Sequence, residues 1–117
     1  MLDVTPTLPI RDMNQSVAFY EDAGFEVRVH EGGGFAFVAH DEASVFDLGL
    51  EPEMDPATNK AGCYVIVPVP DEWHALFTDL HYPVTELRDE EYGMREFTLT
   101  DPSGNHVRIG RASMPDE

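Results

Sequence analysis

Short stretches of alternating apolar and polar residues recur along the chain, and this period of two predicts β-strands. The first half contains three of them, at Val27–Val29, Phe35–His40 (FAFVAH) and Ser44–Leu50 (SVFDLGL). Three glycines at 32–34 lie between the first two. Because a further strand-like run follows them and no helix does, the glycines predict a turn and not a phosphate-binding loop.

Two other stretches have the spacing of an amphipathic helix. The first has apolar residues at Met13, Val17, Tyr20 and Ala23. Asp12 with Gln15 three residues later resembles a capping box, and Gly24 is typical of a left-handed helix end. For the second, we expect Asp71 to cap a helix whose apolar side is formed by Trp73, Leu76, Phe77 and Leu80.

The remaining segments are also predicted to be extended. In Leu2–Ile10, Pro6 and Pro9 remove two backbone donors, which indicates an edge strand or a strand that leaves its own sheet. The second half has strand-like runs at 63–70, 83–89, 95–101 and 105–110. Between the last two, the DPSG sequence at Asp101–Gly104 predicts a turn.

The two halves repeat the same order of elements. Residues 19–27 align with residues 76–84 at a constant offset of 57, with apolar and aromatic positions in register. We therefore expect an α+β fold in a single domain, built from two βαβββ modules at about 1–57 and 61–112. The modules are expected to form a curved mixed sheet around a cleft.

Composition narrows the possible partners and the location. Seven Lys and Arg against 23 Asp and Glu give a formal net charge of −16, which disfavours nucleic acid and anionic membranes. No apolar run is long enough to span a bilayer, and no signal peptide is evident. The single cysteine, Cys63, is consistent with a cytoplasmic protein.

The stretches RDMNQSVAFYEDAGFEV and DPSGNHVRI resemble the vicinal oxygen chelate superfamily, which includes glyoxalases, dioxygenases and bleomycin resistance proteins. The opening TPTLPIRD is closest to the bleomycin-binding resistance proteins. That resemblance implies a homodimer in which the first strand is exchanged between subunits.

Enzymes of the superfamily hold a divalent metal at four strand positions, and the resemblance places these at Thr5, Asp47, Tyr64 or Val65, and Arg108. Threonine, tyrosine and valine are poor ligands or none, and arginine puts a permanent cation at the site. A catalytic ion generally needs three protein ligands. We therefore expect no metal site and no cofactor.

The same resemblance implies a ligand site of aromatic rings and negative charge. The candidate residues are Phe35, Phe37, Asp47, Tyr64, Asp89 and Tyr92. The expected activity is non-catalytic sequestration of a cationic, bleomycin-like glycopeptide antibiotic. Two alternatives stay open: a metal-dependent lyase, isomerase or dioxygenase with misplaced ligands, and a small-molecule sensor or partner-binding module.

Overall fold

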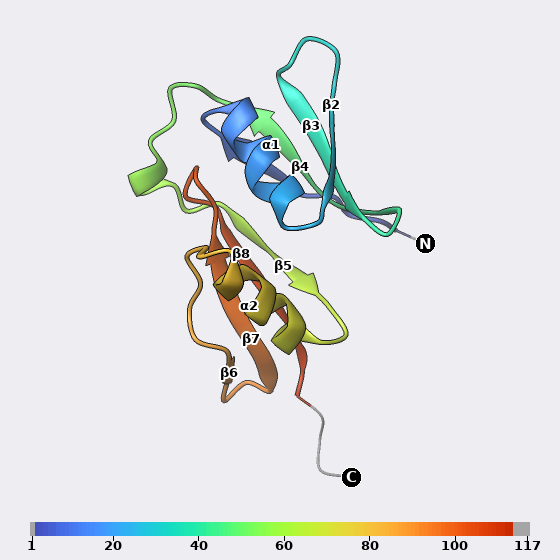
Figure 1. Ribbon diagram of the computed structural model, residues 1–117, viewed down its shortest axis with the longest axis vertical. Helices are drawn as coiled ribbons and strands as arrows, with labels where there is room; N and C mark the ends of the chain where they lie inside the picture. The colour runs from blue at the N-terminus through green and yellow to red at the C-terminus, as the bar shows by residue number, and fades with distance from the viewer. Residues whose placement is uncertain (1, 114–117) are drawn as a thin grey trace. The chain divides into compact units, whose positions relative to one another are not determined.

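The computed structural model describes residues 2–113, and they form two compact units. The first unit runs as far as Ala61 and also contains Asp101–Asn105. The second unit contains Gly62–Thr100 and resumes at His106. Each unit has one α-helix and one four-stranded mixed sheet, as Figure 1 shows.

The first unit has the strand order β1-β4-β3-β2. Its edge strand β1 runs parallel to β4, and the other neighbours are antiparallel. The elements are β1 (Thr7–Ile10), α1 (Met13–Asp22), β2 (Glu26–Val29), β3 (Phe35–His40) and β4 (Ala43–Leu50), followed by the 3₁₀-helix η1 (Pro56–Thr58).

The second unit has the corresponding strand order, β5-β8-β7-β6, and its edge strand β5 runs parallel to β8. Its elements are β5 (Gly62–Ile66), α2 (Pro70–Asp79), β6 (Arg88–Asp89), β7 (Met94–Thr100) and β8 (His106–Ala112). Helices α1 and α2 have the same length and begin 57 residues apart, the offset found in the sequence. The α+β class and the two βαβββ modules are confirmed.

Three local predictions in the second unit were wrong. Strand β5 ends at Ile66, because Pro68 and Pro70 interrupt the run predicted as far as 70. Helix α2 begins with Pro70, which needs no backbone donor at the first helical position, so Val69 and not Asp71 is its N-cap. The run at 83–89 pairs only through Val84 and the two residues of β6.

Each helix packs on one face of its own sheet through aromatic side chains. In the first unit the ring centroids of Tyr20 on α1 and Phe46 on β4 are 5.2 Å apart. In the second unit those of Phe77 on α2 and Phe97 on β7 are 6.0 Å apart. All four side chains are at most 2% exposed, so each helix contributes a large ring to its core.

The predicted DPSG turn belongs to the core of the first unit. The carboxylate of Asp101 accepts hydrogen bonds from the Tyr20 hydroxyl at 2.7 Å and from the backbone amides of Ser103 and Asn105 at 2.9 Å. The Asn105 side chain donates to the backbone oxygen of Pro9 at 2.8 Å, which ties the turn to β1. Gly104 is required here, since a Cβ would lie 2.2 Å from the Pro56 oxygen.

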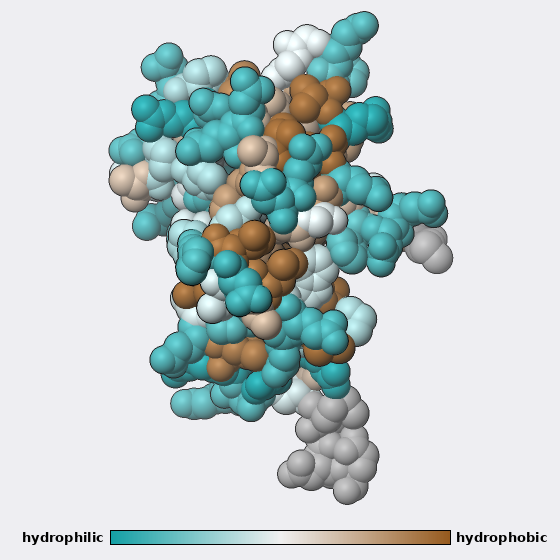
Figure 2. Space-filling view, in the orientation of Figure 1, coloured by the Kyte–Doolittle hydropathy of each residue, from teal (hydrophilic) through white to brown (hydrophobic). Residues whose placement is uncertain are grey.

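The surface is mainly hydrophilic. In the view of Figure 2, hydrophilic residues cover most of the visible face, and apolar residues occur in separate groups. Within residues 2–113, neither helix has the length and apolar character needed to cross a membrane.

The two helices end in the same motif but with different residues. Gly24 has a φ of 94°, and His81, which is 57 residues later, has a φ of 62°. In both places the following amide bonds back to the helix, Phe25 to the Tyr20 oxygen and Tyr82 to the Phe77 oxygen. A side chain is strained in this left-handed conformation, and glycine is not.

We predict that His81→Gly raises the free energy of unfolding by about 0.5–1 kcal/mol, measured by chemical denaturation. The matched control is Gly24→His, which should lower it by about 1 kcal/mol because space is open there and only backbone strain is added. Unchanged or lower stability of His81→Gly would contradict the strain.

Candidate ligand-binding surfaces

The helix-free face of each sheet, meaning the face opposite its helix, carries the aromatic residues expected to bind a ligand. In the first unit, Ala36 and Val38 are buried toward the helix, so Phe35 and Phe37 project from the other side of β3. Both rings are half-buried, and their centroids are 5.3 Å apart. The predicted pair is therefore a single aromatic surface.

Charged groups lie beside this pair. Asp47 is opposite Phe37 in the β3–β4 register, and the guanidinium carbon of Arg28 lies 4.6 Å from the centre of the Phe37 ring. Burial raises the pKa of the Asp47 carboxyl above its usual value. Asp47 thus lies on the helix-free face as expected, together with a cation that the sequence did not reveal.

The helix-free face of the second unit contains two of the predicted residues, and an unpredicted one joins them. The carboxylate of Glu96, on β7, is only 6% exposed. Its Oε1 accepts a hydrogen bond from the Tyr64 hydroxyl at 2.8 Å, and its Oε2 accepts one from the Tyr92 hydroxyl at 2.5 Å. One buried carboxylate therefore fixes both rings.

The protonation of the two tyrosines supports this arrangement. Burial first, and then the hydrogen bond to Glu96, raises the pKa of Tyr64. The hydrogen bond to Glu96 is the main reason that the pKa of Tyr92 is raised. Since tyrosine ordinarily ionises near pH 10, both hydroxyls remain protonated donors at neutral pH.

A glycine makes the contact between Tyr64 and Glu96 possible. Gly110 on β8 is opposite Glu96, and a Cβ at this position would lie 2.5 Å from the Tyr64 hydroxyl and 2.7 Å from the Glu96 Cβ. Real side chains do not approach so closely, so any larger residue would displace the tyrosine or the carboxylate. In the sequence this glycine was only one residue of a predicted strand.

Arg108 lies next to this group, opposite Tyr64 in the β5–β8 register. Its guanidinium carbon is 4.8 Å from the centre of the Tyr64 ring, and its Nη1 is 3.9 Å from Glu96 Oε2. The Arg108 side chain is half exposed. The cation that argued against a metal site is therefore held by a ring and a carboxylate of its own unit.

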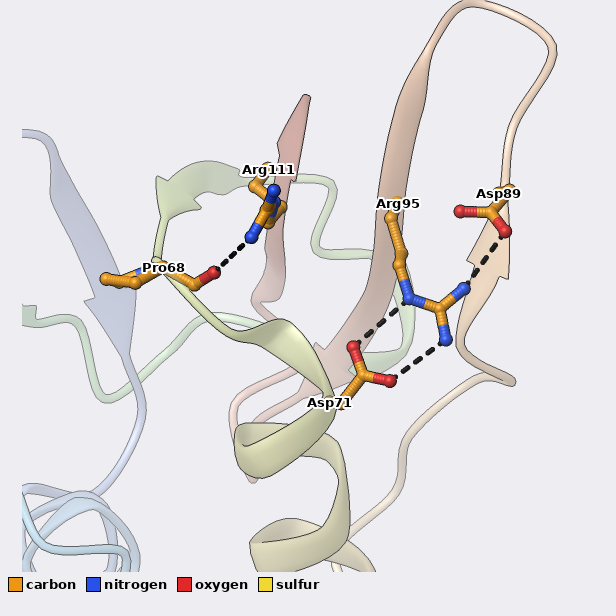
Figure 3. A network of polar contacts seen from close by, with 5 residues as sticks. All are labelled: Pro68, Asp71, Asp89, Arg95 and Arg111. Carbon is orange, nitrogen blue, oxygen red and sulfur yellow. Dashed lines mark hydrogen bonds and ion pairs between the residues drawn. The ribbon is translucent and has the colours of Figure 1, made fainter. Parts of the chain in front are cut away.

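Asp89 differs from the expectation of a free acidic group. Arg95 binds it at 3.0 Å and binds Asp71 through two further hydrogen bonds at 3.1 and 2.9 Å, as Figure 3 shows. Hydrogen bonding from Arg95 lowers the pKa of Asp71, and both carboxylates raise that of Arg95. Asp89 belongs to this ion-pair network and not to the Glu96 group.

A hollow of about 630 Å³ adjoins the ion-pair network. Its lining includes Asp71, Asp89, Arg95 and Arg111. In Figure 3 the Arg111 guanidinium points toward Pro68, whose backbone oxygen it binds at 2.8 Å. The charged groups of this hollow are thus largely engaged with one another or with the backbone.

The residues at the expected metal positions do not fit a catalytic ion. Thr5 precedes β1, and the residue that the register places beside Asp47 is Thr7, whose counterpart 57 residues later is Tyr64. Tyr64 donates its proton to Glu96, and Arg108 brings a positive charge. Between residues 2 and 113, no three His, Cys, Asp or Glu side chains are grouped closely enough to hold a metal.

Comparison with known proteins identifies the family. Residues 4–109 match the Glyoxalase/Bleomycin resistance protein/Dioxygenase superfamily. The bleomycin resistance protein of Geobacillus stearothermophilus is 28% identical over 125 residues, which cover 92% of this chain and 94% of that protein. A Staphylococcus aureus bleomycin resistance protein matches equally well.

Two solved structures share the fold. The bleomycin resistance determinant encoded on transposon Tn5 is 20% identical, with a TM-score of 0.87 over 97% of this chain and 100% of that one. A bleomycin-binding protein complexed with bleomycin is 21% identical, with a TM-score of 0.85 over the same shares. The resemblance predicted from the sequence is confirmed, and the chain belongs to the glyoxalase/bleomycin resistance protein/dioxygenase superfamily.

Proposed function

We propose that this chain is a non-catalytic binding protein that confers resistance by sequestering a bleomycin-type glycopeptide antibiotic. The observation that carries the proposal is the Tyr92 ring, which is 63% exposed yet fixed through its hydroxyl to the buried carboxylate of Glu96. An exposed ring held in one position is suited to stacking on the planar rings of a ligand. The bleomycin resistance proteins among its relatives support the choice of ligand.

Fixing the rings favours tight binding. A free tyrosine side chain loses rotamer freedom when a ligand immobilises it, at about 0.5–1.5 kcal/mol per side chain. Glu96 has already restricted Tyr64 and Tyr92, so less of the stacking energy is lost on binding. Sequestration needs this economy because protection depends on affinity alone, without turnover.

Charge contributes to the rate of encounter more than to the contact itself. The net charge of −16 attracts a cationic antibiotic over the distance of a Debye length, about 10 Å at 0.1 M salt. At the candidate surface, however, Asp89 is neutralised by Arg95, and Glu96 is accompanied by Arg108. The ligand's cationic group is therefore expected away from these pairs, with Asp47 the candidate partner in the first unit.

The proposal includes a cytoplasmic homodimer in which the N-terminal strand is exchanged. Leu2 and Val4 are 93% and 86% exposed, although both side chains are apolar and lie just before the edge strand β1. A second subunit would remove this apolar surface from water. A cytoplasmic location agrees with the single free cysteine, Cys63.

Calorimetric titration with metal-free and copper(II)-loaded bleomycin should give saturable heat at micromolar protein. Tyr92→Ala should weaken binding about fivefold or more because a stacking ring is lost, and Tyr92→Phe, which keeps the ring, should weaken it less. The control is Leu76→Ala, which truncates an exposed apolar side chain on α2. No heat with either form of the drug would reject bleomycin as the ligand, and equal affinities for Tyr92→Ala and Leu76→Ala would reject the role of the ring.

Sedimentation velocity tests the assembly. The parent chain should sediment as a dimer, and replacing Leu2 and Val4 together by serine should shift the equilibrium toward the monomer because the apolar contact is lost. The control is Val29→Ser, which changes an exposed valine on β2, the opposite edge strand. A monomeric parent, or a dimer unaffected by the double substitution, would contradict strand exchange.

A further inference from the structure

Arg108 has hydrogen-bonding capacity that the protein does not use. A guanidinium carries five N–H donors. Among residues 2–113, Arg108 makes a ring contact with Tyr64 and a 3.9 Å ion pair with Glu96, and it makes no hydrogen bond. In contrast, Arg95 uses all three of its nitrogens on Asp71 and Asp89.

The position of Arg108 is nevertheless restricted. Its guanidinium lies over the Tyr64 ring, and Tyr64 is itself fixed to Glu96. Both oxygens of Glu96 already accept a tyrosine hydroxyl, so the carboxylate does not need Arg108 as a hydrogen-bond donor. The result is an exposed, oriented set of donors on the same face as an exposed aromatic ring.

Resting on the proposed function, we propose that Arg108 is a specificity-determining residue that binds an acceptor oxygen attached to the planar ring system of the ligand. Carbonyl, carboxylate and sulfonate groups share this chemistry, and the anionic ones bind a guanidinium most strongly. The ligand class is therefore a planar aromatic compound with an oxygen acceptor near its rings. A cationic substituent at the same place is disfavoured.

This role differs from that of a simple counter-ion to Glu96. If Arg108 only neutralises the buried carboxylate, its removal disturbs Tyr64 and Tyr92 and weakens every stacked ligand alike. If it binds an acceptor, its removal weakens ligands that carry the acceptor and spares those that do not. Two probes with the same ring system distinguish these cases.

Fluorescence titration with pyrene-1-sulfonate and pyrene-1-methylammonium makes the comparison. For Arg108→Gln, we expect the affinity for the sulfonate to fall about tenfold, since charge-assisted hydrogen bonds are lost, and the affinity for the methylammonium to stay the same or rise. The matched control is Arg111→Gln, which removes one charge from the same strand, on the face that carries α2. It should change both affinities by less than about threefold because general electrostatics at this distance are screened.

Three results would overturn the proposal: no binding of the sulfonate to the parent chain, an equal loss for both probes in Arg108→Gln, or a loss no larger than in Arg111→Gln. If Arg108→Gln does not fold, Arg108→Lys keeps the charge beside Glu96 but loses the planar fork. It should still lower the affinity for the sulfonate selectively, and an unchanged affinity would count against the proposal. None of these results depends on bleomycin, so they are distinct from failure of the proposed function.

Discussion

Each sheet of this protein has a single helix to cover it, and a helix protects only one face. The face under α1 or α2 contains the buried rings Tyr20, Phe46, Phe77 and Phe97. The other face cannot be made of the same apolar residues without exposing them to water. It carries aromatic residues with polar handles and charged groups instead, and this is why the candidate ligand surfaces lie there.

In the second unit, this requirement is met by one buried carboxylate. A buried charge is costly unless hydrogen bonds and a counter-charge compensate it. Glu96 has both, from two tyrosine hydroxyls and from Arg108. The same contacts that stabilise Glu96 also orient the rings and the guanidinium toward a ligand, so stability and binding depend on one group of residues.

The first unit solves the problem differently. Phe35 and Phe37 have no polar handle, and Arg28 covers the Phe37 ring. A planar ligand that stacks on Phe37 must therefore share the ring with this cation or displace it. The two surfaces consequently offer different chemistry, although they come from equivalent faces of a repeated module.

The elements that could be predicted from the sequence are those set by local periodicity. The helix at Met13–Asp22, its Asp12 cap and the common face of Phe35 and Phe37 follow from spacings of a few residues. The repeat also placed α2, but the end of β5 depended on prolines that act through missing donors.

Contacts made by tertiary register could not be predicted in this way. Glu96 is an ordinary polar position of an alternating strand until Tyr64, 32 residues earlier, is placed beside it. The partner of Asp89 was equally hidden, since Arg95 also binds Asp71 from the start of α2. The acidic run therefore predicted a free negative charge where the structure has an ion pair.

The central claim is that a planar ligand binds to the helix-free faces and not among the helices. The chain has four tyrosines, with Tyr64 and Tyr92 on the helix-free face of the second unit and Tyr20 and Tyr82 packed against helix residues. NMR of the protein with isotope-labelled tyrosine rings, titrated with metal-free bleomycin, follows all four at once. The account predicts that the signals of Tyr64 and Tyr92 shift while those of Tyr20 and Tyr82 stay in place. Shifts confined to Tyr20 and Tyr82, or no shifts at saturating drug, would contradict it.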